Sequence, residues 1–79
     1  MDFPQYRKRF DEKSFYKILN ERQMEEVQII GDKAFKHVLN ADKYFEIVLL
    51  QDILSGNNGI YLPIEENEYA IKEKSISTK

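Results

Sequence analysis

Few residues in this chain could carry chemistry, and they are widely spaced. The only histidine, His37, lies between Lys36 and Val38, and no residue near it in sequence could share a catalytic or ligating role. A general base or a metal ligand needs companions that converge on the same point. We therefore predict a structural or surface role for His37, on the same side of a strand as Phe35 and Leu39.

The densest acidic group consists of Glu65, Glu66 and Glu68. Magnesium and calcium sites need oxygens that converge from several directions, whereas adjacent glutamates on one helical turn diverge. Acidic residues in a first turn instead meet the positive end of the helix dipole. The group therefore predicts a helix N-terminus rather than a metal site.

Basic and aromatic residues alternate near the N-terminus, in Tyr6-Arg7-Lys8-Arg9-Phe10. Cations that meet phosphates and rings that stack on bases would suit a single-stranded nucleic-acid platform. The net charge of −2 opposes this interpretation, and no glycine interleaves the aromatics as it does in RNA-recognition sheets. In the other interpretation, Tyr6 and Phe10 face the core while Arg7 and Arg9 face solvent. The candidate contacts for nucleic acid or a partner are Tyr6, Arg7, Lys8, Arg9, Tyr16 and Lys17.

The sequence lacks the patterns that catalysis requires. Without cysteine, the chain can form no disulfide, thiolate metal site or Cys–His pair. Its three glycines stand in turn-like contexts rather than in a phosphate-binding loop, and no serine has a nucleophile-elbow setting. We expect no enzymatic activity, no cofactor, no metal and no small-molecule ligand.

The 79 residues suffice for a single domain over residues 1–73, which we expect to be followed by a disordered tail over 74–79. Stability must come from packing, to which five Phe and five Tyr can contribute large apolar areas. The N-terminus lacks the pattern of a signal peptide, and the longest apolar run, residues 47–50, is far below the roughly 20 residues of a membrane span. We expect a cytoplasmic protein with no membrane partner.

Two hairpins are predicted in the first half of the chain. β-prone runs at residues 6–10 and 14–19 flank a polar connection at 11–13. Residues 24–40 allow two interpretations. Their apolar residues fall at helical spacing, but Gly31-Asp32 interrupts them, and the flanks 25–30 and 34–40 are strand-like. We favour a hairpin with its turn at 31–33, and one long helix is the alternative.

A helix is predicted over residues 44–54, with Asp42 as its N-cap and Gly56 as its C-terminal stop, and with Asn57-Asn58-Gly59 continuing the turn. Ile47, Leu50 and Leu54 form a stripe that should be buried. Residues 60–64 then form a short strand, and Pro63 places its end at a sheet edge. A second helix starts at 65–68, with Glu68 and Lys72 as an i, i+4 pair.

These elements predict an α+β fold, a small antiparallel sheet of four to five strands packed by one main helix plus a short C-terminal helix. Four stretches, residues 3–8, 14–18, 25–31 and 51–54, resemble small uncharacterised bacterial proteins of the Bacteroidetes type. The likeness spans most of the chain and implies a bacterial cytoplasmic origin. It transfers no functional residue, because no activity is assigned to such proteins.

The function we expect is that of a non-enzymatic protein-interaction module, with a two-fold homodimer as one form of it. RNA or single-stranded DNA binding through the basic and aromatic N-terminal strands is the alternative. The dimer expectation rests on sheet edges, which proteins protect by charge, proline or pairing. Pro63 and the charges of residues 6–10 would protect two edges, whereas nothing comparable guards residues 27–30. A dimer should therefore pair or bury residues 27–30.

Overall fold

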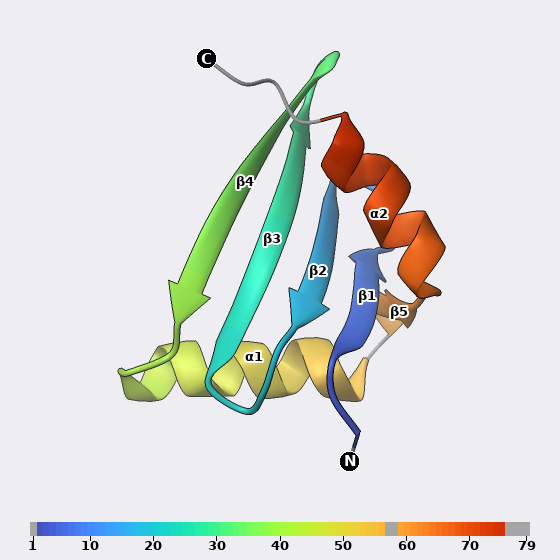
Figure 1. The fold of residues 1–79 in the computed structure, drawn as a ribbon. Helices are drawn as coiled ribbons and strands as arrows, with labels where there is room; N and C mark the ends of the chain where they lie inside the picture. Colours follow the sequence, from blue (N-terminus) through green and yellow to red (C-terminus); the bar gives the residue numbers. More distant parts are fainter. Residues whose placement is uncertain (1, 57–58, 76–79) are drawn as a thin grey trace.

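Five antiparallel strands and two helices make up the structure, a computed structural model that describes residues 2–56 and 59–75 (Figure 1). The strands are β1 (Gln5–Arg9), β2 (Ser14–Ile18), β3 (Gln23–Ile30), β4 (Lys33–Asn40) and β5 (Tyr61–Pro63). The helices are α1 (Tyr44–Ser55) and α2 (Glu66–Lys74). The predicted α+β class, with its main helix and its short C-terminal helix, is confirmed.

The sheet order is β4-β3-β2-β1-β5. The first four strands follow one another as a meander, and β5 returns after α1 to pair with β1 through Arg7↔Pro63 and Arg9↔Tyr61. The strands at the two edges are therefore β4 and β5. Pro63 lies on an edge strand, as predicted, where its missing N–H leaves no gap in the ladder.

The hairpin interpretation of residues 24–40 is confirmed, and the helix alternative is wrong. β3 and β4 pair along their whole length, from Gln23↔Asn40 to Ile30↔Lys33. The two-residue turn between them has Gly31 at a φ of 63°, a left-handed conformation that glycine adopts at little cost. The first predicted hairpin is present as well, since β1 and β2 pair in antiparallel register.

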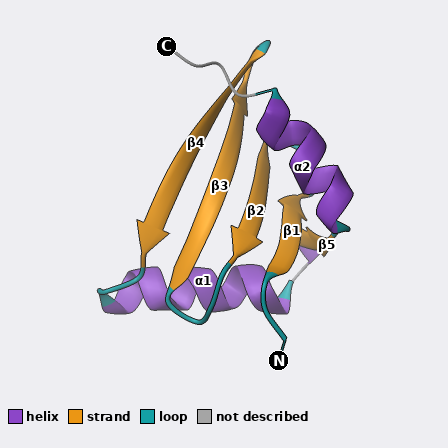
Figure 2. Cartoon of the chain, viewed as in Figure 1, coloured by secondary structure: helices purple, strands orange, loops and turns teal. Residues whose placement is uncertain are grey.

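Two small cores lie on opposite faces of this one sheet. Figure 2 shows α1 and α2 on different sides of it. The α1 face, defined by Tyr16, Ile18 and Met24, packs against Leu50 and Ile53 of α1. The α2 face, defined by Phe15, Val27 and Ala34, packs against Tyr69 of α2. Each helix therefore covers part of one face, and the alternation of side chains along each strand supplies both cores.

Two details of α1 differ from the sequence prediction. The helix begins at Tyr44, as predicted, but the N-cap is Lys43, directly before it, and not Asp42. The Glu46 carboxylate replaces the predicted cap by accepting hydrogen bonds from the backbone N–H groups of Asp42 (3.1 Å) and Lys43 (3.0 Å). In the predicted stripe, Leu50 is fully buried and Ile47 and Leu54 are half-buried.

The C-terminal end of α1 agrees with prediction, since Gly56 ends it at a φ of 67°. The predicted Glu68–Lys72 pair in α2 is wrong. Glu68 instead accepts from Lys8 of β1 at 3.3 Å, and the Lys72 ammonium lies 5.3 Å from the centre of the Phe15 ring. Glu68 and Lys72 therefore contact different residues of the sheet, Lys8 and Phe15, instead of each other.

Asn57 and Asn58 of the predicted turn, and residues 76–79 of the predicted tail, lie outside the described residues. Within the described ranges, neither helix has the length and apolar character needed to cross a membrane.

Changing Leu50 to Ala should lower the free energy of unfolding by about 2–5 kcal/mol, because the side chain is fully buried beneath the α1 face. Denaturant unfolding followed by circular dichroism measures this loss. The matched control is Leu49→Ala on the same helix, where the side chain is 41% exposed and the loss should stay below about 1 kcal/mol. Equal losses for the two variants would contradict the packing of α1.

Gly31→Ala should destabilise the protein by about 1–2 kcal/mol, because an L-residue resists a left-handed backbone. An added Cβ would meet nothing within 4 Å, so the loss would report the backbone conformation alone. Gly31→Asn should cost less, since asparagine tolerates this conformation better than alanine does. A rise in melting temperature for the alanine variant would argue against this turn.

Candidate interaction surfaces

The six residues predicted to contact a partner do not form one surface. Successive residues of a strand face opposite ways, so β1 sends Tyr6 and Lys8 to the α2 face and Arg7 and Arg9 to the α1 face. On the α2 face, the Tyr6 ring lies 5.6 Å from that of Tyr69. Tyr16 of β2 lies on the α1 face and is only 6% exposed. Lys17 is on the α2 face, opposite Tyr6.

The cations of β1 are already engaged within the protein. Lys8 contacts Glu12 at 2.7 Å and Glu68 at 3.3 Å. The bond to Glu12 raises the pKa of Lys8, and Lys8 in turn lowers the pKa of Glu12. Arg9 pairs with Asp11 at 3.4 Å. A phosphate would have to compete with these carboxylates.

The positions of Arg7 and Phe10 differ from the prediction that Phe10 faces the core and Arg7 faces solvent. Arg7 does not simply face solvent, because its guanidinium donates to the carbonyl oxygens of Tyr6 (2.9 Å) and Leu54 (3.2 Å). Partial burial lowers the pKa of Arg7. Phe10 is not in the core, since 59% of it is exposed in the turn after β1. The prediction for Arg7 is wrong because both faces of β1 pack against other parts of the protein. The prediction for Phe10 is wrong because β1 ends at Arg9.

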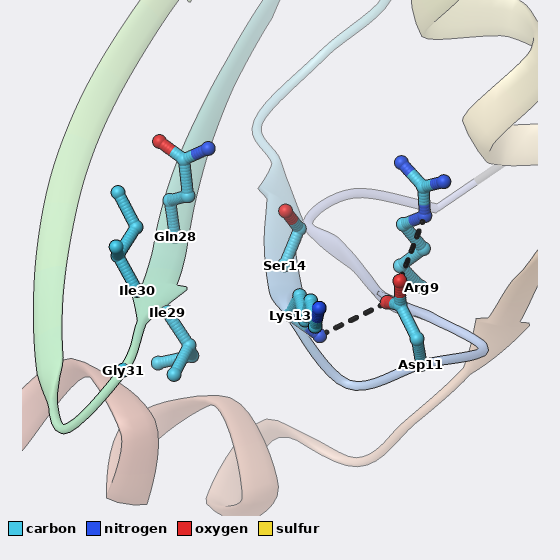
Figure 3. Close-up of a pocket in the computed structure, with 8 residues that line it drawn as sticks. All are labelled: Arg9, Asp11, Lys13, Ser14, Gln28, Ile29, Ile30 and Gly31. Carbon is cyan, nitrogen blue, oxygen red and sulfur yellow. Dashed lines mark hydrogen bonds and ion pairs between the residues drawn. The ribbon is translucent and has the colours of Figure 1, made fainter.

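A depression of about 440 Å³ lies where the β1–β2 and β3–β4 turns approach each other (Figure 3). Several of its polar groups already have partners within the protein. Asp11 accepts from the backbone N–H of Lys13 at 3.1 Å and pairs with Arg9, and Ser14 donates to Glu26 at 2.9 Å. These contacts lie within the β1–β2 hairpin and between β2 and β3, so they would compete with a ligand for the polar groups of the depression. The side chains that line it are Arg9, Asp11, Lys13, Ser14, Gln28, Ile29 and Ile30.

His37 is exposed on the α1 face of β4, and its Nε2 lies 3.2 Å from Oε1 of Gln28. Of the acidic group at the start of α2, Glu65 and Glu66 are exposed, and Glu68 contacts Lys8. Among the residues that the structure describes, no group of three or more His, Cys, Asp or Glu could hold a metal ion.

The surface that the sequence did not predict is the outer edge of β4, which we call the β4 edge. β4 is the last strand of the sheet, and its ladder to β3 closes at Ile30↔Lys33 beside a two-residue turn. In such a hairpin this closing pair is hydrogen-bonded, so alternate residues point their N–H and C=O groups outward. By this alternation, the outward groups belong to Ala34, Lys36, Val38 and Asn40.

Residues 27–30, predicted to be the unguarded run, are not at an edge. They belong to β3, which pairs with β2 on one side and with β4 on the other. The charges of residues 6–10 do not guard an edge either, since β1 is interior. The strand order, set by β5 returning to β1, leaves β4 as the long free edge.

Little on the β4 edge acts as a guard. Lys36 is directed across the α2 face, where it contacts Glu73 at 2.8 Å and Glu25 at 3.2 Å. The bond to Glu73 is the main cause of the raised pKa of Lys36. Val38 is 63% exposed on the α2 face, and Phe35 is 38% exposed on the α1 face. Among residues 2–56 and 59–75, the outward backbone groups of this edge have no hydrogen-bond partner, and apolar side chains flank them.

The first turn of α1 extends this surface. Figures 1 and 2 show the N-terminal end of α1 projecting past β4, beyond the edge of the sheet. The two aromatic residues of that turn are strongly exposed, Tyr44 at 82% and Phe45 at 66%. An additional strand paired to β4 would have this apolar turn beneath its α1 face.

Stability should fall as the pH rises from about 10, where unfolded tyrosine ionises, to about 12. Burial, with Glu26 as a second cause, raises the pKa of Tyr16 to about 12, so the folded state resists an ionisation that the unfolded chain accepts. In Tyr16→Phe, the decrease in the free energy of unfolding between about pH 10 and pH 12 should be smaller by on the order of 2 kcal/mol. Urea unfolding at several pH values measures this difference. Tyr44→Phe, at an exposed position, is the control, and identical profiles for both variants would contradict the burial of Tyr16.

Comparisons with protein-family models, with curated proteins and with solved structures each find no match for this chain. The resemblance to small bacterial proteins stays a prediction. The function has to be inferred from the surfaces of the molecule itself.

Proposed function

We propose that this protein is a non-enzymatic interaction module that accepts an extended strand from a protein partner at the β4 edge. The observation that carries the proposal is the eight-residue length of β4 at the end of the sheet order. Strand addition uses main-chain hydrogen bonds for affinity and side-chain contacts for specificity. The β4 edge offers both, through its outward backbone groups and through Val38, Phe35 and the first turn of α1.

The same surface distinguishes protein docking from nucleic-acid binding. No hydrogen bond among the described residues engages the outward backbone groups of β4, so a strand could pair with them without displacing a described partner. By contrast, Lys8 and Arg9 are held by carboxylates, Tyr16 is buried, and the remaining candidates divide between two faces. A net charge of −2 adds a further cost to phosphate binding. These observations favour the protein-interaction function.

The non-enzymatic part of the proposal rests on the sequence, with its single histidine and its lack of cysteine. Cytoplasmic location and bacterial origin stay predictions of the sequence in the same way.

Tagged protein should capture a partner from lysate of the native cells, and Val38→Lys should abolish the capture. A lysine at the middle of an edge strand opposes pairing with a further strand. Phe10→Lys is the matched control, since Phe10 has a similar exposed fraction and lies after β1, away from β4. Capture that survives Val38→Lys, or no capture of any chain including the protein itself, would argue against the β4 edge as a docking site.

Binding to labelled single-stranded RNA, measured by fluorescence anisotropy at two salt concentrations, tests the alternative function. A protein-docking module should show no binding at either concentration. A nucleic-acid binder should lose affinity steeply as salt rises. Salt-dependent binding that Lys17→Ala and Arg9→Ala weaken would favour nucleic acid over a protein partner.

A further inference from the structure

We propose that the strand received by the β4 edge is β4 of a second copy of this chain, so that two sheets join into one continuous sheet about a two-fold axis. This inference rests on the proposed function and names its partner. It is carried by the match between the β4 edge and the first turn of α1, both of which each copy would contribute.

Symmetry limits how two β4 strands can pair. A two-fold axis that joins them in one antiparallel sheet runs perpendicular to the sheet, so residues opposite one another share a face. The residues with outward backbone groups, Ala34, Lys36, Val38 and Asn40, must meet one another. In every register that satisfies both conditions, the two-fold axis passes beside a residue that lies opposite its own copy. Centres near either end of β4 shorten the ladder, which leaves Lys36 and His37 as the central candidates.

Charge and apolar contacts choose between these two centres. Centring on Lys36 would place two like charges directly opposite each other, which is unfavourable. Centring on His37 places Lys36 opposite Val38 and Phe35 opposite Leu39. In this register, Lys36 would lie beside the exposed Val38, and Glu25 and Glu73 would hold its ammonium away from that apolar side chain.

The first turn of α1 supplies the argument for a second copy rather than an unrelated strand. Leu39 packs on the α1 core, at the end of β4 from which the chain leads into α1. The register centred on His37 brings Phe35 of the second copy beside Leu39, on the α1 face, at the edge past which the first turn of α1 projects (Figure 1). Phe35 would then lie close to the first turn of α1, whose Tyr44 and Phe45 are exposed and could cover it.

The two-fold axis forms this contact twice. Each chain carries an exposed aromatic side chain near the start of β4 and an apolar turn near the end of β4, and antiparallel pairing joins start to end. Lys33 of one copy would lie opposite Ala41 of the other, and Asp32 would lie opposite Asp42, so each end places the Lys33 cation between two carboxylates that would otherwise repel each other. An unrelated strand paired to β4 would form the contact with the first turn of α1 once, because it would bring no α1 turn of its own to receive Phe35.

Sedimentation equilibrium from micromolar to near-millimolar protein, near pH 8, measures the association. The wild type should approach a dimer mass as concentration rises, and Phe10→Lys should behave identically. Val38→Lys should raise the dissociation constant at least tenfold, with circular dichroism confirming that the variant is folded. A monomer mass over the whole range would overturn the inference. If the cell-lysate capture then still depends on Val38, only the identity of the partner is wrong, and the proposed function stands.

Cysteine cross-linking tests the register without relying on that variant, because the chain has no cysteine of its own. His37→Cys should form a disulfide-linked dimer under mild oxidation, since residue 37 would face its own copy at a non-hydrogen-bonded position. Phe10→Cys is the control for random collision. Faster cross-linking by Lys36→Cys than by His37→Cys, or equal cross-linking by His37→Cys and Phe10→Cys, would overturn the proposed arrangement.

Discussion

The pleat of β2 is the constraint on which the rest of the structure depends. Phe15 and Tyr16 are adjacent, both are buried, and they point to opposite faces of the sheet. Phe15 therefore joins Tyr69 of α2, while Tyr16 meets Tyr61 edge-on at 5.7 Å in the core beneath α1. Each face needs a helix to exclude water from its aromatic side chain. A chain of this length can thus fill two thin cores with one sheet.

The same alternation disperses the residues that looked most functional. In β1 it sends cations to both faces, where each meets a local partner, Glu12 and Glu68 for Lys8 and Asp11 for Arg9. The charges therefore serve to tie β1 to its neighbouring turn and to α2. A pattern of interleaved basic and aromatic residues indicates a binding platform only when the strand presents one face to solvent, and β1 does not.

The free surface arises instead from how the two helices are placed. α2 packs on the α2 face against β2 and reaches β4 through the Lys36–Glu73 pair, and α1 lies across the other face and extends beyond the sheet on the β4 side (Figure 1). β5 closes the opposite edge with three residues and Pro63. Protection is therefore concentrated at one edge. A further strand at the long β4 edge would cover exposed apolar surface on Val38, Phe35 and the first turn of α1.

The sequence by itself determined the elements, because their signals act over a few residues. Gly31 and Gly56 mark a turn and a helix end through positive φ, and Pro63 marks an edge through its missing N–H. Only the tertiary structure decided which strand lies at the other edge and which charges are engaged. Those outcomes depend on β5 returning to β1 and on Arg7 meeting Leu54, contacts between segments far apart in the chain. The sequence did not reveal the candidate site for this reason. An edge is a property of strand order, and the alternation of side chains within β4 does not show whether another strand lies beside it.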